Sequence, residues 1–274
     1  MTIKNILVQV DHDDRNAERT ALAVSLAHQH EAHLVGVFVY FGPPATYPWA
    51  EGEFGQEVLR RHEAATIETA GKLRAEFEQR ANDAMVSHEW LAEEENMQPV
   101  LATHARYADL VVVSQSTRRS SENGRGVRLA EEVILASGSP TIIVPEAGSF
   151  EKNIDRVVIA WNGSRESGRA VRDALPLLKT VEKVILFSVN ADDSQLPTAE
   201  LAHFLARHGV KVHDTHAIAS DIDVGDAILN AVADNSADLL VMGAYGHARL
   251  REFVFGGATR HILRHMTSLT LLTH

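Results

Sequence analysis

The chain has 274 residues, of which 45% are hydrophobic and 23% charged, enough apolar material for one large or two ordinary globular domains. Its 26 basic and 37 acidic residues give a formal charge of -11, which disfavours binding to nucleic acid or to anionic lipid. The absence of cysteine excludes disulfides, thiol catalysis, cysteine-ligated zinc and iron–sulfur clusters.

The first predicted element is a strand at residues 4–10, which contains the apolar run 6–10. This run is too short for the hydrophobic region of a secretion signal, and it leads directly into acidic residues. No stretch of the sequence approaches the roughly 20 consecutive apolar residues that span a bilayer. We therefore expect a cytoplasmic protein that neither enters a membrane nor is secreted.

Apolar, β-branched strands and amphipathic helices alternate after this point. In the first half, strands are predicted at residues 34–39, 109–113 and 139–144, and helices at 17–28 and, long and charged, at 51–82. An insertion at 41–50 carries Tyr47 and Trp49. These aromatic residues either form a lid or a contact with a partner, or pack over the sheet edge of their own domain.

The second half repeats this plan. Residues 155–162 echo residues 4–11, further strands are predicted at 184–189, 238–242 and 268–272, and helices at 167–178, 198–208, 224–233 and 260–266. About five strands per half, joined by helices, predict two α/β domains, each with a parallel sheet covered on both faces. We place the boundary near residues 145–149 and the domains at 1–148 and 152–274.

Glycines gather after the predicted strand at 238–242. They are Gly243, Gly246, Gly256 and Gly257, and the basic side chains of His247, Arg249, Arg251 and Arg260 lie among or just after them. Glycine N–H groups can form an anion-binding nest, and the start of the following helix favours phosphate. The pattern predicts a phosphate site; the alternative is that these glycines only end the strand and begin the helix.

The spacing Gly243-Ala-Tyr-Gly246, nine residues, Gly256 resembles the Gly-x-x-Gly, nine residues, Gly-Ser/Thr motif of the universal stress protein family. P-loop, dinucleotide and nucleophile-elbow motifs are absent from the sequence. Over essentially its whole length, the chain is similar to two universal stress protein domains in tandem. The resemblance implies an adenine-nucleotide alpha hydrolase-like fold, with five parallel strands ordered 3-2-1-4-5 in each half. It also implies an intramolecular pseudo-dimer, in which the strands at 141–144 and 267–273 meet.

The same resemblance implies that the second half binds ATP, or ADP or AMP, with or without Mg²⁺. The implied nucleotide-binding residues are Asn162, Val189, Gly243, Gly246, His247, Gly256, Gly257, Ala258 and Thr259. Two of them depart from the family pattern, because Gly257 replaces a serine or threonine and Asn162 replaces an acidic residue.

The first half departs further from the motif. It keeps Asp11 and Val39, but Ser114, Thr117 and Val127 replace the motif glycines. We expect this half to be mainly structural. The alternative is a different anion, held by Arg118, Arg119, Arg125 and Arg128.

Fifteen histidines raise the question of a metal site. One group is His28, His30 and His33, and a second is His203, His208, His213 and His216. We expect both groups to be structural or exposed. We also expect no carboxylate to complete a site with His261 and His265, so no metal ligand is assigned.

The leading hypothesis is a cytoplasmic stress-response regulatory protein that binds an adenine nucleotide through its second half and contacts unidentified protein partners. A further homodimer is compatible with this hypothesis. No catalytic residue is assigned, so any ATP hydrolysis is expected to be slow. The alternatives are a nucleotide-free interaction scaffold and, from another class, a metal-dependent hydrolase that uses the histidines.

Overall fold

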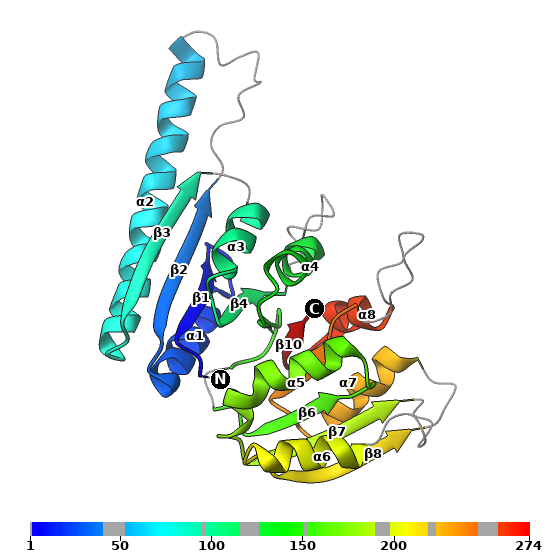
Figure 1. Ribbon diagram of the computed structural model, residues 1–274. Helices are drawn as coiled ribbons and strands as arrows, with labels where there is room; N and C mark the ends of the chain where they lie inside the picture. The colour runs from blue at the N-terminus through cyan, green and yellow to red at the C-terminus, as the bar shows by residue number, and fades with distance from the viewer. Residues whose placement is uncertain are drawn as a thin grey trace.

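The computed structural model describes residues 2–40, 53–94, 97–115, 126–150, 153–189, 198–218, 223–245 and 257–274. Strands and helices alternate along the chain, as the sequence predicts (Figure 1). The first half contains β1 (Asn5–Val10), α1 (Asn16–His30), β2 (His33–Tyr40), α2 (Glu53–Asp83), β3 (His88–Glu94), α3 (Met97–Ala105), β4 (Leu110–Ser114), α4 (Gly126–Ser137) and β5 (Thr141–Val144). The second contains β6 (Arg156–Ala160), α5 (Arg165–Leu178), β7 (Lys183–Val189), α6 (Thr198–Arg207), β8 (Val212–Ile218), α7 (Val224–Asp234), β9 (Leu239–Gly243), α8 (Gly257–His265) and β10 (Leu269–Thr273).

The strands form one sheet, with the order β3-β2-β1-β4-β5-β10-β9-β6-β7-β8. Each half therefore has the order 3-2-1-4-5, and all neighbours within a half are parallel. The two last strands, β5 and β10, pair antiparallel with Ile142 opposite Leu271. The expected meeting of the last strands is confirmed, and it joins two five-stranded sheets into one sheet of ten strands.

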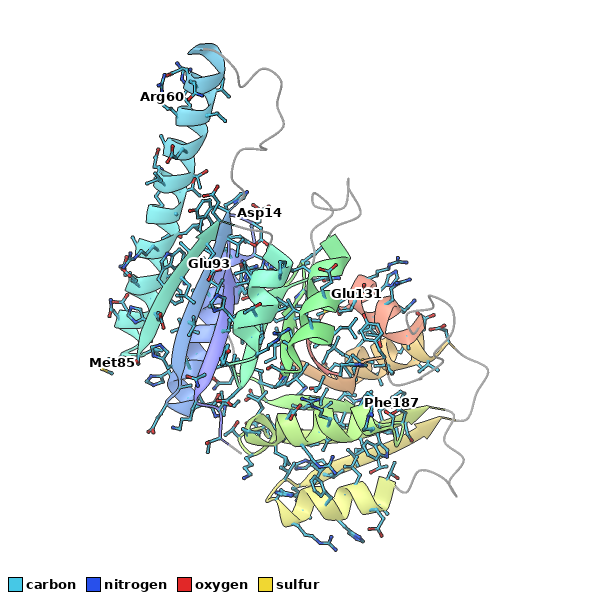
Figure 2. The ribbon with its side chains drawn as sticks, turned by 45° about the horizontal axis from the view of Figure 1, so that its top comes forward. Asp14, Arg60, Met85, Glu93, Glu131 and Phe187 are labelled. Carbon is cyan, nitrogen blue, oxygen red and sulfur yellow. The ribbon has the colours of Figure 1, made fainter. Side chains whose placement is uncertain are left out.

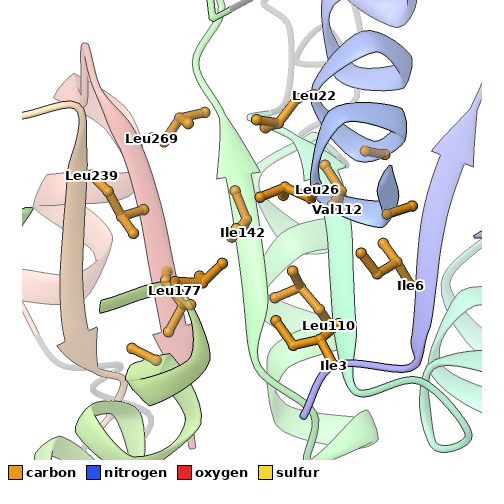
Figure 3. Close-up of a cluster of buried hydrophobic side chains, with 14 of the residues drawn as sticks. Ile3, Ile6, Leu22, Leu26, Leu110, Val112, Ile142, Leu177, Leu239 and Leu269 are labelled. Carbon is orange, nitrogen blue, oxygen red and sulfur yellow. The ribbon is translucent and has the colours of Figure 1, made fainter. Parts of the chain in front are cut away.

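Both faces of the sheet are covered by helices, and both cores run through the two halves. One face is covered by α1, α2, α5 and α6, and the other by α3, α4, α7 and α8. Figure 3 shows the first core where it crosses the junction, with Ile142 of β5 between Val112 of β4 and Leu269 of β10. Burial on both faces explains why the central strands are almost wholly apolar.

The edge strands β3 and β8 are harder to find in the sequence. Their sequences, HEWLAEE and VHDTHAI, contain charged and histidine residues at several positions. An edge strand is covered less completely than a central one, so it tolerates polar side chains. Apolar runs therefore mark four of the five strands in each half, and the fifth follows from the alternation of elements.

The long, charged helix predicted at residues 51–82 is α2, and it covers one face of the first half. Its C-terminal part buries Leu73, Phe77 and Ala81 in the core, and its N-terminal part extends beyond the end of the sheet (Figure 1). Tyr47 and Trp49 of the insertion lie outside the described residues. None of the helices in the described ranges has the length and apolar character needed to cross a membrane.

Candidate functional site

The second half has a topological switch point between its central strands β6 and β9. The chain leaves β6 toward β7 on one side, while β9 lies on the other. In open parallel sheets, ligands bind outside the carboxyl ends of the strands at such a point. The residues that follow or end these strands are Asn162 after β6, Val189 at the end of β7 and Gly243 at the end of β9.

The first turn of α5 packs directly on the end of β9. A Cβ atom on Gly243 would lie 2.4 Å from the backbone N of Ser167 and 2.5 Å from the backbone C of Glu166. No side chain fits in this space, so the structure gives Gly243 a packing reason to be glycine. Close helix–strand contact at a ligand-binding turn is one of the tasks that glycine performs in nucleotide-binding folds.

Asn162 shapes the turn that leads into α5. Its Oδ1 atom accepts hydrogen bonds from the backbone N of Ser164 (3.1 Å) and from the Ser164 hydroxyl (2.7 Å). Ser164 in turn caps the helix, because its Oγ atom accepts from the backbone N of Ser167 at 3.1 Å. Asn162 is exposed, so its amide lies at the surface next to the switch point.

Helix α8 begins beside the same edge. Its first residue, Gly257, is exposed, and nothing lies within 4 Å of the position where its Cβ would be. Ala258 follows half-buried, and Thr259 is 4% exposed. The Thr259 hydroxyl accepts a hydrogen bond from the backbone N of Tyr245 at 3.5 Å, so this oxygen connects α8 to the segment that follows β9.

The structure therefore brings Asn162, Gly243, Gly257, Ala258 and Thr259 to one edge of the sheet. Val189 lies at the same edge, paired with Ile218 of β8, and only its backbone is described. Gly246, His247 and Gly256 lie outside the described residues, as do Arg118, Arg119 and Arg125 of the first half.

The equivalent point in the first half is filled by a buried arginine. The Arg19 side chain is 0% exposed, and its Nε donates to the Gln9 carbonyl at 2.5 Å. Its terminal nitrogens contact Asp11 at 2.7 Å and Asp13 at 3.3 Å, and one of them donates to the Ser114 hydroxyl. One guanidinium thus bridges the carboxyl ends of β1 and β4.

The second half has small residues at the corresponding positions. When the repeat is aligned through Asp11 and Asn162, Arg19 corresponds to Ala170. The last residue of β4, Ser114, corresponds to the last residue of β9, Gly243. The charged cluster of the first half is therefore replaced by close packing of α5 on β9. This difference supports the expectation that the first half is mainly structural, and no motif in the sequence marks Arg19 as the buried residue that causes it.

The Arg19 cluster also changes the titration of Asp11. Burial alone would raise the pKa of this carboxyl group, but the charge of Arg19 and hydrogen bonds from Arg19, from the Asp13 backbone and from Gln9 lower the pKa below its ordinary value. The ionised carboxylate is therefore the form that the fold stabilises.

The predicted histidine groups make separate contacts. His28 lies within hydrogen-bonding distance of the Ala84 carbonyl (2.9 Å), and His33 of the Ser87 hydroxyl (2.8 Å). His213 accepts a hydrogen bond from the Val184 backbone N (3.3 Å), and His216 lies 3.0 Å from the Asp214 carboxylate. Within the described ranges, the three side chains close enough to share an ion are Asp223, Asp226 and His261.

The expectation that no carboxylate accompanies His261 is wrong. Its Nε2 atom lies 2.7 Å from Asp226 Oδ1, because α7 and α8 pack side by side. Asp223 caps α7 by accepting from the backbone N of Gly225 at 2.8 Å. An ordinary helix cap and a single hydrogen bond therefore account for this cluster. The Nδ1 atom of His265 lies 2.9 Å from the carbonyl oxygen of His261, within hydrogen-bonding distance.

Comparison with known proteins finds a family match for the second half of the chain. The model of the universal stress protein family matches residues 153–274. A universal stress protein of Synechocystis is 29% identical over 179 residues, which are 60% of this chain and 57% of that relative. The match thus spans little more than half the length of this curated relative.

Two solved structures share the fold over nearly the whole chain. A universal stress protein from Archaeoglobus fulgidus covers 99% of this chain and 96% of its own, with a TM-score of 0.74 and 16% identity. A functionally unknown protein from Pseudomonas aeruginosa covers 99% and 92%, with a TM-score of 0.60 and 16% identity. These structures show the shared fold, and the family match identifies the second half: residues 153–274 are a domain of the universal stress protein family.

Proposed function

We propose that residues 153–274 bind an adenine nucleotide at the carboxyl ends of β6, β7 and β9, and that the chain acts as a regulatory protein of the stress response. The observation that carries this proposal is the meeting of Asn162, Gly243 and the start of α8 at the switch point of the second half. We also propose the domain bounds 1–148 and 152–274 for the two units.

Each group in this proposal has a physical task. The Asn162 amide and the Val189 backbone would contact the base and ribose, while backbone N–H groups at the start of α8 would face phosphate. The sequence pattern adds Gly246, His247 and Gly256 to the phosphate side. We propose ATP, ADP or AMP as the ligand, with Mg²⁺ accompanying the longer phosphate chains.

We further propose one nucleotide per chain. In the first half, the buried Arg19 cluster occupies the space between the ends of β1 and β4. A phosphate there would have to displace Asp11 and Asp13 from the guanidinium and would face two carboxylates. Like-charge contact and loss of a buried ion pair both oppose such a site.

Equilibrium titration of nucleotide-stripped protein with ATP, ADP and AMP tests the proposal. We expect saturation near one nucleotide per chain, and Gly257→Asp should weaken binding about tenfold or more, because a carboxylate would face the phosphates. The variant Gly257→Asp is suitable because Cβ has open space there, and an acidic residue in a first helical turn favours the helix.

Gly71→Asp is the matched control, since Gly71 also lies in a helix with nothing within 4 Å of its Cβ position. Its affinity should equal that of the unmodified chain. Equal affinities for both variants would contradict the proposed phosphate position. The absence of any binding to the unmodified chain would favour the nucleotide-free interaction scaffold.

A further inference from the structure

A buried carboxylate of the first half contacts the proposed nucleotide site of the second. Glu131, on α4, is 5% exposed, and its Oε1 atom lies 3.6 Å from Nε of Arg260 on α8. The negative charge of the same carboxylate also acts on the phenol of Tyr245, which follows β9. Figure 2 shows Glu131 where α4 faces α8.

Glu131 and Arg260 are equivalent residues of the two halves. Each lies the same number of residues before the strand positions Ile142 and Leu271, which are directly opposite each other in the β5–β10 pair. At a two-fold axis, equivalent residues can meet. Two identical halves would place like residues at this point, whereas this chain places a carboxylate opposite a guanidinium.

Tyr245 has an unusual backbone conformation, which contacts with neighbouring residues must stabilise. Its φ angle is 58°, in the left-handed region that residues with a side chain seldom occupy. Its backbone N donates to Thr259 at 3.5 Å, the preceding carbonyl, of Ala244, is 3.1 Å from Nδ1 of His274, and its ring makes an edge contact with that histidine. Such a conformation persists only where several contacts stabilise it.

The phenol end of Tyr245 depends on the first half. Burial, followed by the negative charge of Glu131, raises the pKa of Tyr245 well above its ordinary value. The phenol therefore remains a neutral donor across the physiological pH range.

We propose that Glu131 of the first half is a positioning residue for the nucleotide site of the second half. It holds Tyr245, which precedes the glycine-rich segment, and Arg260, which lies in the first turns of the helix after that segment. The first half thereby becomes part of the binding site without contacting the ligand. This inference rests on the proposed function, and it predicts a residue of one half that controls affinity in the other.

Three single variants and one double variant test the inference by nucleotide titration of the full chain. Glu131→Ala removes both contacts, Tyr245→Phe removes only the phenol, and Glu132→Ala changes the same charge at an exposed neighbour on α4. We expect Glu131→Ala to raise the Kd about tenfold, the loss typical of removing a contact with a charged group that is shielded from solvent, and Tyr245→Phe to raise it by a smaller factor. The double variant should be no weaker than Glu131→Ala alone, and Glu132→Ala should match the unmodified chain.

Hydrogen exchange without nucleotide separates this inference from the proposed function. Amides of residues 257–263 should exchange about fivefold faster in Glu131→Ala and Tyr245→Phe than in Glu132→Ala, while β6 and β9 remain equally protected. If the unmodified chain binds no nucleotide, the proposed function fails and exchange alone decides the positioning role. Equal exchange in all variants, or faster exchange throughout the core strands, would overturn that role.

We expect these variants to fold, because the residues that lose a contact are not left as buried, unpaired charges. Arg260 is 35% exposed, so solvent can take the place of the Glu131 carboxylate around its guanidinium. Tyr245→Phe keeps the ring and its packing, and it therefore tests the role of the phenol group even if Glu131→Ala is less stable than expected.

Discussion

Replacing Arg19 by methionine should lower the free energy of unfolding by about 3–5 kcal/mol at pH 7, the usual cost of removing one partner from a buried ion pair. Methionine fills most of the space but leaves the Asp11 carboxylate largely buried and without a cation. The Gln9 carbonyl and the Ser114 hydroxyl also lose their donor. Chemical denaturation of the unmodified chain and of Arg19→Met, followed by the same probe, measures the difference in the free energy of unfolding.

Two controls separate charge from packing in this prediction. Arg74→Met removes an exposed arginine from its pair with Glu78, and it should change stability by only about 0.5 kcal/mol. Adding Asp11→Asn and Asp13→Ser to Arg19→Met copies the residues of the second half and removes the uncompensated carboxylates. This combination should recover part of the loss, and a loss below about 1 kcal/mol for Arg19→Met alone would contradict a buried ion pair.

The Arg19 effect should also depend on pH. Because the pKa of Asp11 is lowered in the folded protein, its carboxylate stabilises the fold above the unfolded pKa of about 4. That stabilisation is lost as the pH falls through the folded pKa. The difference between the unmodified chain and Arg19→Met should therefore shrink as the pH falls from 7 to below about 4, because protonation of Asp11 removes the charge that Arg19 pairs with. A constant difference across this range would mean that packing, not charge, dominates.

The fold was accessible from the sequence because its pattern is local and repeated. Apolar runs such as residues 109–113 and 238–242 mark strands buried on both faces, and the repeat shows that both halves share one topology. The resemblance to a known family supplied the strand order and the β5–β10 junction, which the structure confirms. The edge strands could be placed only by alternation, since one side of an edge strand has no strand partner.

The side chains that lie at the switch points of the two halves were less predictable from the sequence. Arg19 lies in an amphipathic helix, where a charged residue is typical of a solvated face, and only the tertiary structure shows it to be buried. The contact of His261 with Asp226 and that of Glu131 with Arg260 join residues far apart in the sequence. Such pairs depend on how helices pack across the sheet, which hydrophobic periodicity does not specify.

The glycine motif shows the same division between local and tertiary information. Its spacing predicts anion binding, and the structure adds that Gly243 is needed for α5 to approach β9. A sequence pattern alone cannot separate these two roles, because both require the same residue. They can be separated by substitutions that leave one role intact.

Gly243→Ala should lower the free energy of unfolding by about 3 kcal/mol, near the upper end of the usual cost of overpacking. The new Cβ would lie 2.4 Å and 2.5 Å from backbone atoms of Ser167 and Glu166, and backbone atoms cannot rotate away as a side chain end can. The first turn of α5 would therefore have to move from the sheet. Thermal and chemical denaturation measure the effect.

Gly257→Ala is the matched control for this prediction. Its Cβ meets nothing within 4 Å, so alanine in the first turn of α8 should be neutral or stabilising by up to about 1 kcal/mol. Equal stability of the two variants would contradict close packing at Gly243. If Gly243→Ala instead keeps its stability and loses only nucleotide affinity, the residue is glycine for the sake of the ligand. A loss of both, with Gly257→Ala unaffected, would mean that the approach of α5 to β9 forms the binding edge itself.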